Sequence, residues 1–183
     1  MTNLIQKLEF SDVKLISASQ YIDERGVFQE ISNTRVLSML LHRSIHFVQT
    51  NYSVSRKGAL RGLHFQKEPY AQTKMIQVLK GEIFDVILNL DKGSKNFGKH
   101  ITLVLSDQNP QKLIIPKGYA HGFMALQNGT EIIYHVDNYW NLEHQYTINW
   151  KDKDLSIKWP ITDNFFISEK DSNGLSFKDF KNL

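Results

Sequence analysis

The feature that most constrains the fold is a series of short apolar segments in the middle of the chain, each rich in β-branched and aromatic residues. Turn signals containing Gly, Asn or Asp separate them, and Asn128-Gly129 is a strong hairpin signal. Strands this short and this evenly spaced indicate a sandwich or a barrel. The predicted strands cover residues 76–79, 83–90, 100–105, 112–115, 121–126 and 131–136.

Two segments depart from this strand pattern. Residues 33–42 have helix-compatible apolar spacing and predict one short helix, and residues 168–183 predict a loop with a short helix. Neither a Gly-rich dinucleotide motif nor a Walker motif occurs, which disfavours a Rossmann or P-loop enzyme. From 183 residues without a linker we expect one domain, 1–183. Its parts are an N-terminal strand segment (about 1–45), a core (about 46–150) and a C-terminal segment (about 151–183).

Composition narrows the chemistry. The absence of cysteine excludes a disulfide scaffold, a thiolate nucleophile, a Cys-based zinc site and an iron–sulfur cluster. No apolar run approaches the length of a membrane span and no secretory signal is evident, so we expect a cytoplasmic protein. The 22 basic and 19 acidic residues give a net charge of +3 without a basic cluster, which does not favour nucleic acid as a partner.

Residues 49–74 and 115–123 carry the densest motifs and resemble the two halves of the cupin signature. The matching positions are Gly58, His64, Pro116, Gly118 and His121. Gln66 stands where the signature has its second histidine, and Gln72 lies about where it has a glutamate. A cupin metal needs about three good nitrogen or oxygen ligands. The resemblance therefore implies an all-β cupin jelly roll, a β-sandwich-like barrel with a few short helices, that binds no metal.

At finer grain, seven motifs in register resemble the dTDP-4-dehydrorhamnose 3,5-epimerase family, covering most of the chain. They are Asp23-Glu-Arg-Gly-Val-Phe, Phe47-Val-Gln-Thr-Asn-Tyr-Ser, Leu60-Arg-Gly-Leu-His, Gln72-Thr-Lys, Phe97-Gly, Ile115-Pro-Lys-Gly-Tyr-Ala-His-Gly-Phe and Ile157-Lys-Trp-Pro. The resemblance implies a nucleotide-diphosphate 4-keto-6-deoxy sugar as substrate and no cofactor. Protons on C3 and C5 of such a sugar are acidic beside the C4 ketone, so removal and return on the opposite face inverts each centre.

The resemblance assigns four catalytic positions. His64 matches the base, since an imidazole titrates near pH ~6.5, and Asp171 matches the carboxylate that orients it. Lys74 matches the cation at the C4 enolate, and Tyr134 matches the general acid, a phenol that keeps its proton at neutral pH. Each has a structural alternative: a half-buried strand histidine, a surface aspartate, a solvated lysine and a barrel-lining aromatic.

Further positions match the family's substrate contacts. His121 would contact the sugar or its enolate, and arginine suits the diphosphate because its fork pairs two phosphate oxygens. Lys170 matches one more contact. The positions expected to hold the nucleotide and its diphosphate are Arg25, Glu30, Gln49, Asn51 and Arg61.

The chain departs from the family after Tyr134. Trp140 stands where the family has a second tyrosine, Leu142 replaces a proline, and Gln145 replaces a glutamate. Trp offers a larger stacking face and Gln adds a donor. One interpretation is that the base is a purine such as guanine, in a GDP-linked 4-keto sugar or heptose; the other is neutral change at the rim of the site. The same departures leave an epimerase acting at C3 alone as an alternative.

Three other functions compete with the 3,5-epimerase. A non-catalytic cupin that binds a sugar nucleotide would have no need for a base, a cation and an acid together. A metal-dependent cupin is disfavoured by Gln66 and Gln72. A ketoisomerase shares the fold and the substrate class. The resemblance also implies a homodimer with N-terminal strand material packed across the interface, where the edges of an open jelly roll need protection. Its biological setting would be the synthesis of surface polysaccharide or of antibiotic sugars.

Overall fold

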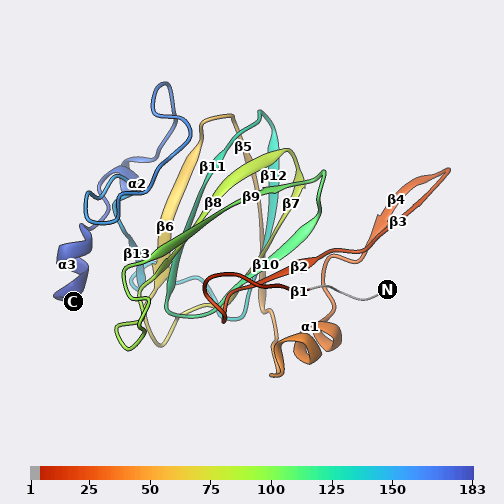
Figure 1. Ribbon diagram of the computed structural model, residues 1–183, viewed down its shortest axis with the longest axis horizontal. Coiled ribbons are helices and arrows are strands. Elements are labelled where there is room, and N and C mark those ends of the chain that lie inside the picture. The colour runs from red at the N-terminus through yellow and green to blue at the C-terminus, as the bar shows by residue number, and fades with distance from the viewer. Residues whose placement is uncertain (1–4) are drawn as a thin grey trace.

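Two antiparallel sheets pack face to face in the computed structural model, which describes residues 5–183 (Figure 1). The first four residues of the predicted N-terminal segment lie outside the described residues. The six-stranded sheet has the order β1 (Ile5–Gln6), β2 (Lys14–Ser17), β10 (Gln111–Ile115), β7 (Lys74–Lys80), β12 (Thr130–Val136) and β5 (Gln49–Ser55). The five-stranded sheet has the order β13 (Gln145–Thr147), β6 (Leu60–Gln66), β11 (Tyr119–Ala125), β8 (Glu82–Asn89) and β9 (His100–Ser106). The expected all-β jelly roll is confirmed.

The six predicted strands correspond to β7 through β12, with ends that differ by one or two residues. The predicted helix is α1 (Thr34–Leu41). It begins after Asn33, whose side chain accepts a hydrogen bond from the Val36 amide, and it ends at His42 in a left-handed conformation. The C-terminal tail forms two short helices rather than one, α2 (Glu169–Ser172) and α3 (Phe177–Lys181).

The hairpin prediction at Asn128-Gly129 is wrong. These residues do form the turn between β11 and β12, and Gly129 has a positive φ of 69°. The two strands nevertheless belong to different sheets, because β12 pairs with β5 and β7. The chain crosses between the layers here and again between β7 and β8, as a jelly roll requires.

The apolar core lies mainly between the two sheets. Ile76 and Ile132 from the six-stranded sheet pack there with Ile87 and Phe123 from the five-stranded sheet. Lys74 precedes Ile76 by two residues and therefore shares its inward face. The ammonium of Lys74 therefore points between the sheets next to the apolar core, so a polar cavity lies beside that core. The C-terminal segment covers the outer face of the five-stranded sheet, and α1 covers part of the six-stranded sheet.

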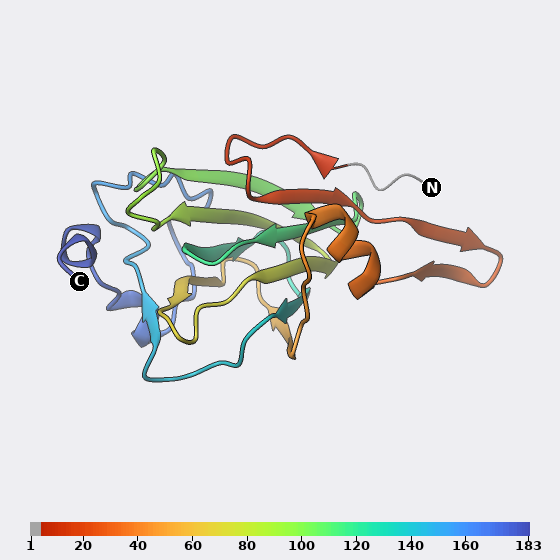
Figure 2. The ribbon, with the colours of Figure 1, turned by 90° about the horizontal axis from the view of Figure 1, so that it is seen from below.

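A two-stranded hairpin, β3 (Gln20–Asp23) and β4 (Gly26–Gln29), extends away from both sheets (Figures 1 and 2). Its side chains Ile22, Val27 and Phe28 are 75%, 60% and 69% exposed. Three large apolar groups on a projecting ribbon form a surface that a partner could cover. None of the helices in residues 5–183 has the length and hydropathy needed to cross a bilayer.

Candidate active site

A cavity of about 250 Å³ opens between the two sheets. The five-stranded sheet contributes side chains from β6 and β11, and the six-stranded sheet contributes side chains from β5, β7 and β12. Eight predicted site residues line it: Asn51, Arg61, His64, Lys74, His121, Tyr134, Trp140 and Gln145. A second hollow adjoins it, shares Arg61, His64 and Gln145, and adds Lys170 and Asp171.

His64 on β6 is paired with Asp171, although 107 residues separate them. The distance from His64 Nε2 to Asp171 Oδ1 is 2.6 Å. Asp171 is held at its other oxygen as well, since the Gly62 amide donates to Oδ2 at 3.1 Å. The Asp171 amide in turn donates to the side chain of Ser168, which caps α2. The carboxylate is thus held at both oxygens and its backbone is held by the helix cap, so it can fix the orientation of the His64 ring.

A close approach of two glycines brings the strands of this site together. Gly62 on β6 has φ of 120°, and a Cβ there would lie 2.5 Å from the Cα of Gly122 on β11. His121 and His64 are paired across the same two strands, next to an irregularity in the register. The motif positions Arg-Gly-Leu-His and Ala-His-Gly-Phe therefore need glycine because backbone meets backbone.

Burial affects the charge of His64. Burial lowers the pKa of His64 below its usual value near 6.5, and the hydrogen bond and charge of Asp171 offset part of that effect. Burial by itself would raise the pKa of Asp171, but the hydrogen bonds from His64 and Gly62 hold it below its usual range. At neutral pH the pair is a neutral imidazole beside a carboxylate, the state in which His64 can accept a proton.

Lys74 reaches into the cavity from the first position of β7. Its Nζ donates to the backbone oxygen of His64 at 3.1 Å. Burial lowers the pKa of Lys74 to about 8, against the opposing influence of Asp85. The ammonium is still the main form at pH 7. A cation with reduced hydration, placed beside the base, can stabilise negative charge that develops on a bound carbonyl oxygen.

Asp85 on β8 is a buried site residue that the sequence reasoning missed. It is fully buried, and its Oδ2 lies 2.7 Å from Nε2 of His121. Its other oxygen has no hydrogen-bond partner among the described residues. The sequence does carry a signal for it: a carboxylate at position 85 shares the inward face of the core residues Ile83 and Ile87, in a strand whose central residues are otherwise apolar.

Tyr134 faces the cavity from β12, on the sheet opposite His64. Its hydroxyl lies 3.3 Å from the Ser53 hydroxyl on β5. Burial raises the pKa of Tyr134 to about 12, an effect that Ser53 and Arg61 reduce. The phenol therefore holds its proton at neutral pH and is suited to give it up only to a strongly basic carbon.

Trp140 and its neighbours form the outer rim of the cavity. The indole Nε1 donates to Gln145 Oε1 at 2.7 Å, and Lys170 Nζ donates to the same oxygen at 2.8 Å. Gln49 links Trp140 to Asn51, because it accepts from the Trp140 amide and donates to Asn51 Oδ1. Arg61 extends along the rim and donates to Ser55 Oγ at 3.2 Å.

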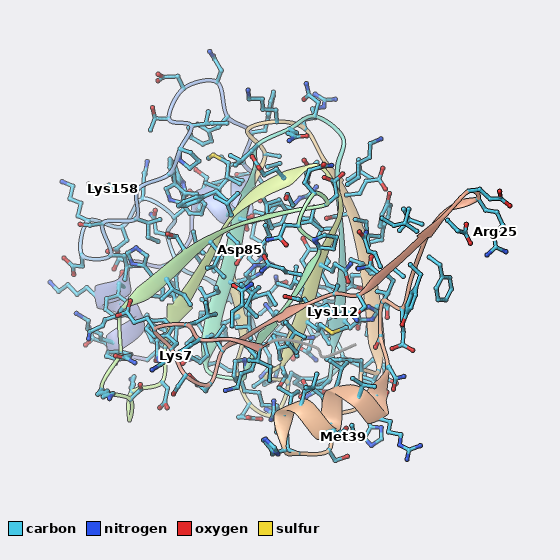
Figure 3. All side chains as sticks on the ribbon, turned by 45° about the vertical axis from the view of Figure 1, so that its right-hand side comes forward. Lys7, Arg25, Met39, Asp85, Lys112 and Lys158 are labelled. Carbon is cyan, nitrogen blue, oxygen red and sulfur yellow. The ribbon has the colours of Figure 1, made fainter. Side chains whose placement is uncertain are left out.

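Arg25 and Glu30 do not reach this cavity within their own chain. Arg25 lies at the tip of the β3–β4 hairpin, where it pairs with Asp23 at 2.5 Å, far from the buried Asp85 (Figure 3). Glu30 follows the hairpin and accepts a hydrogen bond from Asn33 at 3.0 Å. Arg25 extends away from both sheets, and the Glu30 backbone accepts from Lys112 on β10, so neither residue lines the cavity of its own chain. That both touch the nucleotide stays a prediction.

The residues at the cupin metal positions do not fit a metal ion. Both histidines direct Nε2 at a carboxylate, Asp171 or Asp85. Gln66 and Gln72 use their amides on backbone atoms of residues 70, 138, 139 and 141. Among the described residues no group of three His, Cys, Asp or Glu side chains is placed to share an ion.

The jelly roll and this cavity define an enzyme of cupin-like fold, with a His64–Asp171 pair and a separate tyrosine hydroxyl, groups of the kind that a carbohydrate epimerase uses. A family model described as dTDP-4-dehydrorhamnose 3,5-epimerase matches residues 7–179. The chain belongs to this family.

Relatives from several bacteria share its sequence over nearly the whole length. The chain is 42% identical over 173 residues to dTDP-4-dehydrorhamnose 3,5-epimerase of Shigella flexneri, covering 94% of this chain and 95% of that protein. It is 39% identical to the enzyme of the same name from Pseudomonas aeruginosa, with the same coverage.

Solved structures agree in fold. The 3,5-epimerase of Legionella pneumophila, in complex with dTDP-4-keto-L-rhamnose, superposes with a TM-score of 0.91 at 36% identity, covering 94% of this chain and 92% of that one. The Bacillus anthracis enzyme, with TDP and pyrophosphate bound, gives 0.90 at 41% identity, covering 96% and 99%.

Proposed function

We propose that the protein epimerises C3 and C5 of a dTDP-linked 4-keto-6-deoxy sugar, with His64 as base and Tyr134 as acid. His64 takes the proton from a carbon next to the C4 ketone. Lys74 stabilises the resulting enolate oxygen, with His121 beside it. Tyr134 returns a proton to the opposite face of the carbon.

The observation that carries this proposal is the placement of base and acid on opposite sheets of one cavity. His64 enters from the five-stranded sheet and Tyr134 from the six-stranded sheet. A planar enolate between them presents one face to each. Inversion requires this arrangement, whereas a single group on one face would only exchange the proton with retention.

Proton exchange tests the proposal directly. The protein is incubated with the dTDP-linked 4-keto-6-deoxy sugar in deuterated water, and NMR follows C3 and C5. Deuterium at both carbons with inverted products supports the proposal. Exchange at C3 alone would make the protein a 3-epimerase, and no exchange with dTDP-, GDP- or CDP-linked substrates would remove the enzymatic role.

The nucleotide is proposed to be dTDP because the family and the relatives are named for dTDP sugars. The purine alternative rested on Trp140 and Gln145, whose side chains bond to each other at the rim. Calorimetric titration of the purified protein with dTDP and with GDP separates the two. Tighter GDP binding would reverse the assignment.

We also propose a cytoplasmic homodimer in which the β3–β4 hairpin crosses to the partner. The exposed Ile22, Val27 and Phe28 supply apolar surface for that contact. The guanidinium of Arg25 at the hairpin tip would then reach the diphosphate in the partner's cavity. Light scattering on the purified protein tests the dimer, and a monomer with full activity would refute it.

A further inference from the structure

The loop of residues 137–144, between β12 and β13, carries Trp140 at the rim of the cavity. Trp140 is 51% exposed. Glutamine side chains from the body of the protein bond to nearly every backbone position around it. Two of these glutamines, Gln66 and Gln72, stand at positions where the cupin signature has metal ligands.

Gln66 bonds to the residues on both sides of Trp140. Its Nε2 donates to the backbone oxygen of Tyr139 at 3.1 Å and of Tyr70 at 2.7 Å. Its Oε1 accepts from the Asn141 amide at 2.7 Å. The side chain is only 8% exposed, so these bonds are sheltered from water. Both hydrogens and the oxygen of the amide are used, which no carboxylate could reproduce.

Two more glutamines complete the contacts to the loop backbone. Gln72 Nε2 donates to the Asn138 oxygen at 2.8 Å. Gln49 Oε1 accepts from the Trp140 amide at 3.1 Å. Residues 138 to 141 are therefore each bonded to a glutamine side chain that comes from β5, from β6 or from the segment just before β7.

The ring of Trp140 is fixed separately from its backbone. Its Nε1 donates to Gln145 Oε1, which also accepts from Lys170. An exposed aromatic face with a fixed orientation is suited to stack on a planar base. Because the loop is already ordered, little conformational entropy remains to be lost when a nucleotide binds.

We infer that Gln66 and Gln72 are positioning residues that hold the loop 137–144 so that Trp140 is ready to stack on the nucleobase. This inference rests on the proposed function. In this role, Gln66 and Gln72 increase the affinity for the nucleotide indirectly, by holding Trp140 in place. The groups that transfer protons, His64 and Tyr134, lie on β6 and β12, outside this loop.

Gln66→Met tests the inference, because methionine keeps the volume and removes all three bonds. We expect KM for the dTDP sugar to rise about tenfold, the effect of one or two lost hydrogen bonds, with kcat within about twofold. Gln72→Met, which loses a single bond, should raise KM about threefold. Gln127→Met, at an exposed position in the β11–β12 turn, is the matched control and should leave both constants unchanged.

Trp140 fluorescence gives a readout that needs no substrate. The Trp140 signal is obtained by subtraction: the fluorescence of each protein is compared with that of the same protein carrying Trp140→Phe. This subtraction removes the contribution of Trp150 and Trp159. In Gln66→Met the anisotropy of Trp140 should fall and its quenching by acrylamide should increase. If Gln66→Met does not fold, the same measurements on Gln72→Met decide.

Unchanged KM and unchanged Trp140 anisotropy in a folded variant would overturn the inference. A loss of kcat at constant KM would overturn it as well, since that result places the amides with the proton-transfer groups. Failure of the proposed function would look different. The wild-type protein would then show no proton exchange, whereas the anisotropy comparison would still report on the loop.

Discussion

His64 and Asp171 meet at 2.6 Å across 107 residues of sequence, one on a central strand and the other on a four-residue helix near the C-terminus. The Gly62 amide holds the second oxygen of the carboxylate. The orientation of the base therefore depends on a segment outside the two sheets.

His64→Ala should reduce deuterium exchange at C3 and C5 by about 10²–10⁴-fold, because a positioned general base contributes about that much. Affinity for dTDP should stay within about threefold, since the other groups that line the cavity remain. NMR exchange and calorimetry measure the two effects. His46→Ala, at an exposed position, is the control. Retained exchange in His64→Ala would refute the assignment of the base.

The pH dependence of kcat/KM should be bell-shaped. The acid limb reports the proton on His64 and should lie below pH 6.5, because burial lowers the pKa of that imidazole. The alkaline limb should begin near pH 8, where the Lys74 ammonium with its lowered pKa loses its proton. Rates measured from about pH 5 to about pH 9.5 would define both limbs.

Asp171→Asn should move the acid limb to lower pH. The carboxylate raises the pKa of His64 against the effect of burial, so its removal lets that pKa fall further. kcat should also drop, because the amide favours the wrong imidazole tautomer. Asp163→Asn, at an exposed position, should change neither quantity. A limb that stays in place would show that Asp171 does not act on His64 through charge.

Lys74→Met should abolish most activity and yet stabilise the fold. The pKa of Lys74 is lowered from 10.5 to about 8, so the unfolded chain binds its proton more tightly. Keeping the ammonium buried therefore costs stability at pH 7, and the cost fades as the pH rises from 8 to 10.5. Removing the charge should raise the free energy of unfolding. The net gain should be about 1–2 kcal/mol, because the lost hydrogen bond to the His64 backbone oxygen offsets part of the effect.

Urea unfolding at pH 7 measures that change. Lys80→Met, at the other end of β7, removes an exposed lysine that pairs with Glu131 at 3.8 Å and should change stability by less than about 0.5 kcal/mol. If Lys74→Met is instead destabilised, the favourable interaction of the ammonium with the buried Asp85 outweighs the cost of burying the ammonium.

Gly62→Ala should destabilise the protein by about 2 kcal/mol or more beyond Gly26→Ala. The two glycines have nearly the same φ, 120° and 122°. Their surroundings differ, because a Cβ at Gly62 meets the Gly122 backbone and one at Gly26 meets nothing within 4 Å. Chemical denaturation of both variants isolates the backbone contact. Equal losses would show that strain in φ is the whole effect.

Mixed dimers should recover activity if the hairpin serves the partner's cavity. With Arg25 acting in the partner's cavity, Arg25→Ala and His64→Ala place both defects in one active site of a mixed dimer, so the other site has both residues intact. After mixing and subunit exchange, about a quarter of wild-type activity is expected from random pairing. A mixture no more active than its parents would assign Arg25 to its own chain or to no site.

The strand pattern predicted which segments form β7 through β12 because period-2 alternation and turn residues are local properties. It could not predict which sheet each strand joins. The Asn128-Gly129 turn shows why: its local signal is that of a hairpin, but the pairing of β12 with β5 and β7 depends on distant segments. The hairpin β3–β4 and the short β13 were likewise absent from the predicted strands.

The candidate site was largely accessible through motifs, and its exceptions have physical reasons. Asp85 was missed because one carboxylate in an apolar strand matches no spacing rule, although its burial beside His121 requires compensation. Arg25 and Glu30 were matched to the site through family positions, yet the single chain holds them away from it. The proposed dimer would bring Arg25 to the partner's cavity, and no local pattern encodes a second subunit.

The contact between Gly62 and Gly122 has a mechanical consequence. Where backbone meets backbone without intervening side chains, neither strand can slide or tilt without moving the other. His64 and His121 flank this contact on paired strands. Any displacement caused by heat or by a bound sugar therefore carries both rings together as one rigid block. The spacing between the two imidazoles is preserved by two residues that have no side chain to take part in the chemistry.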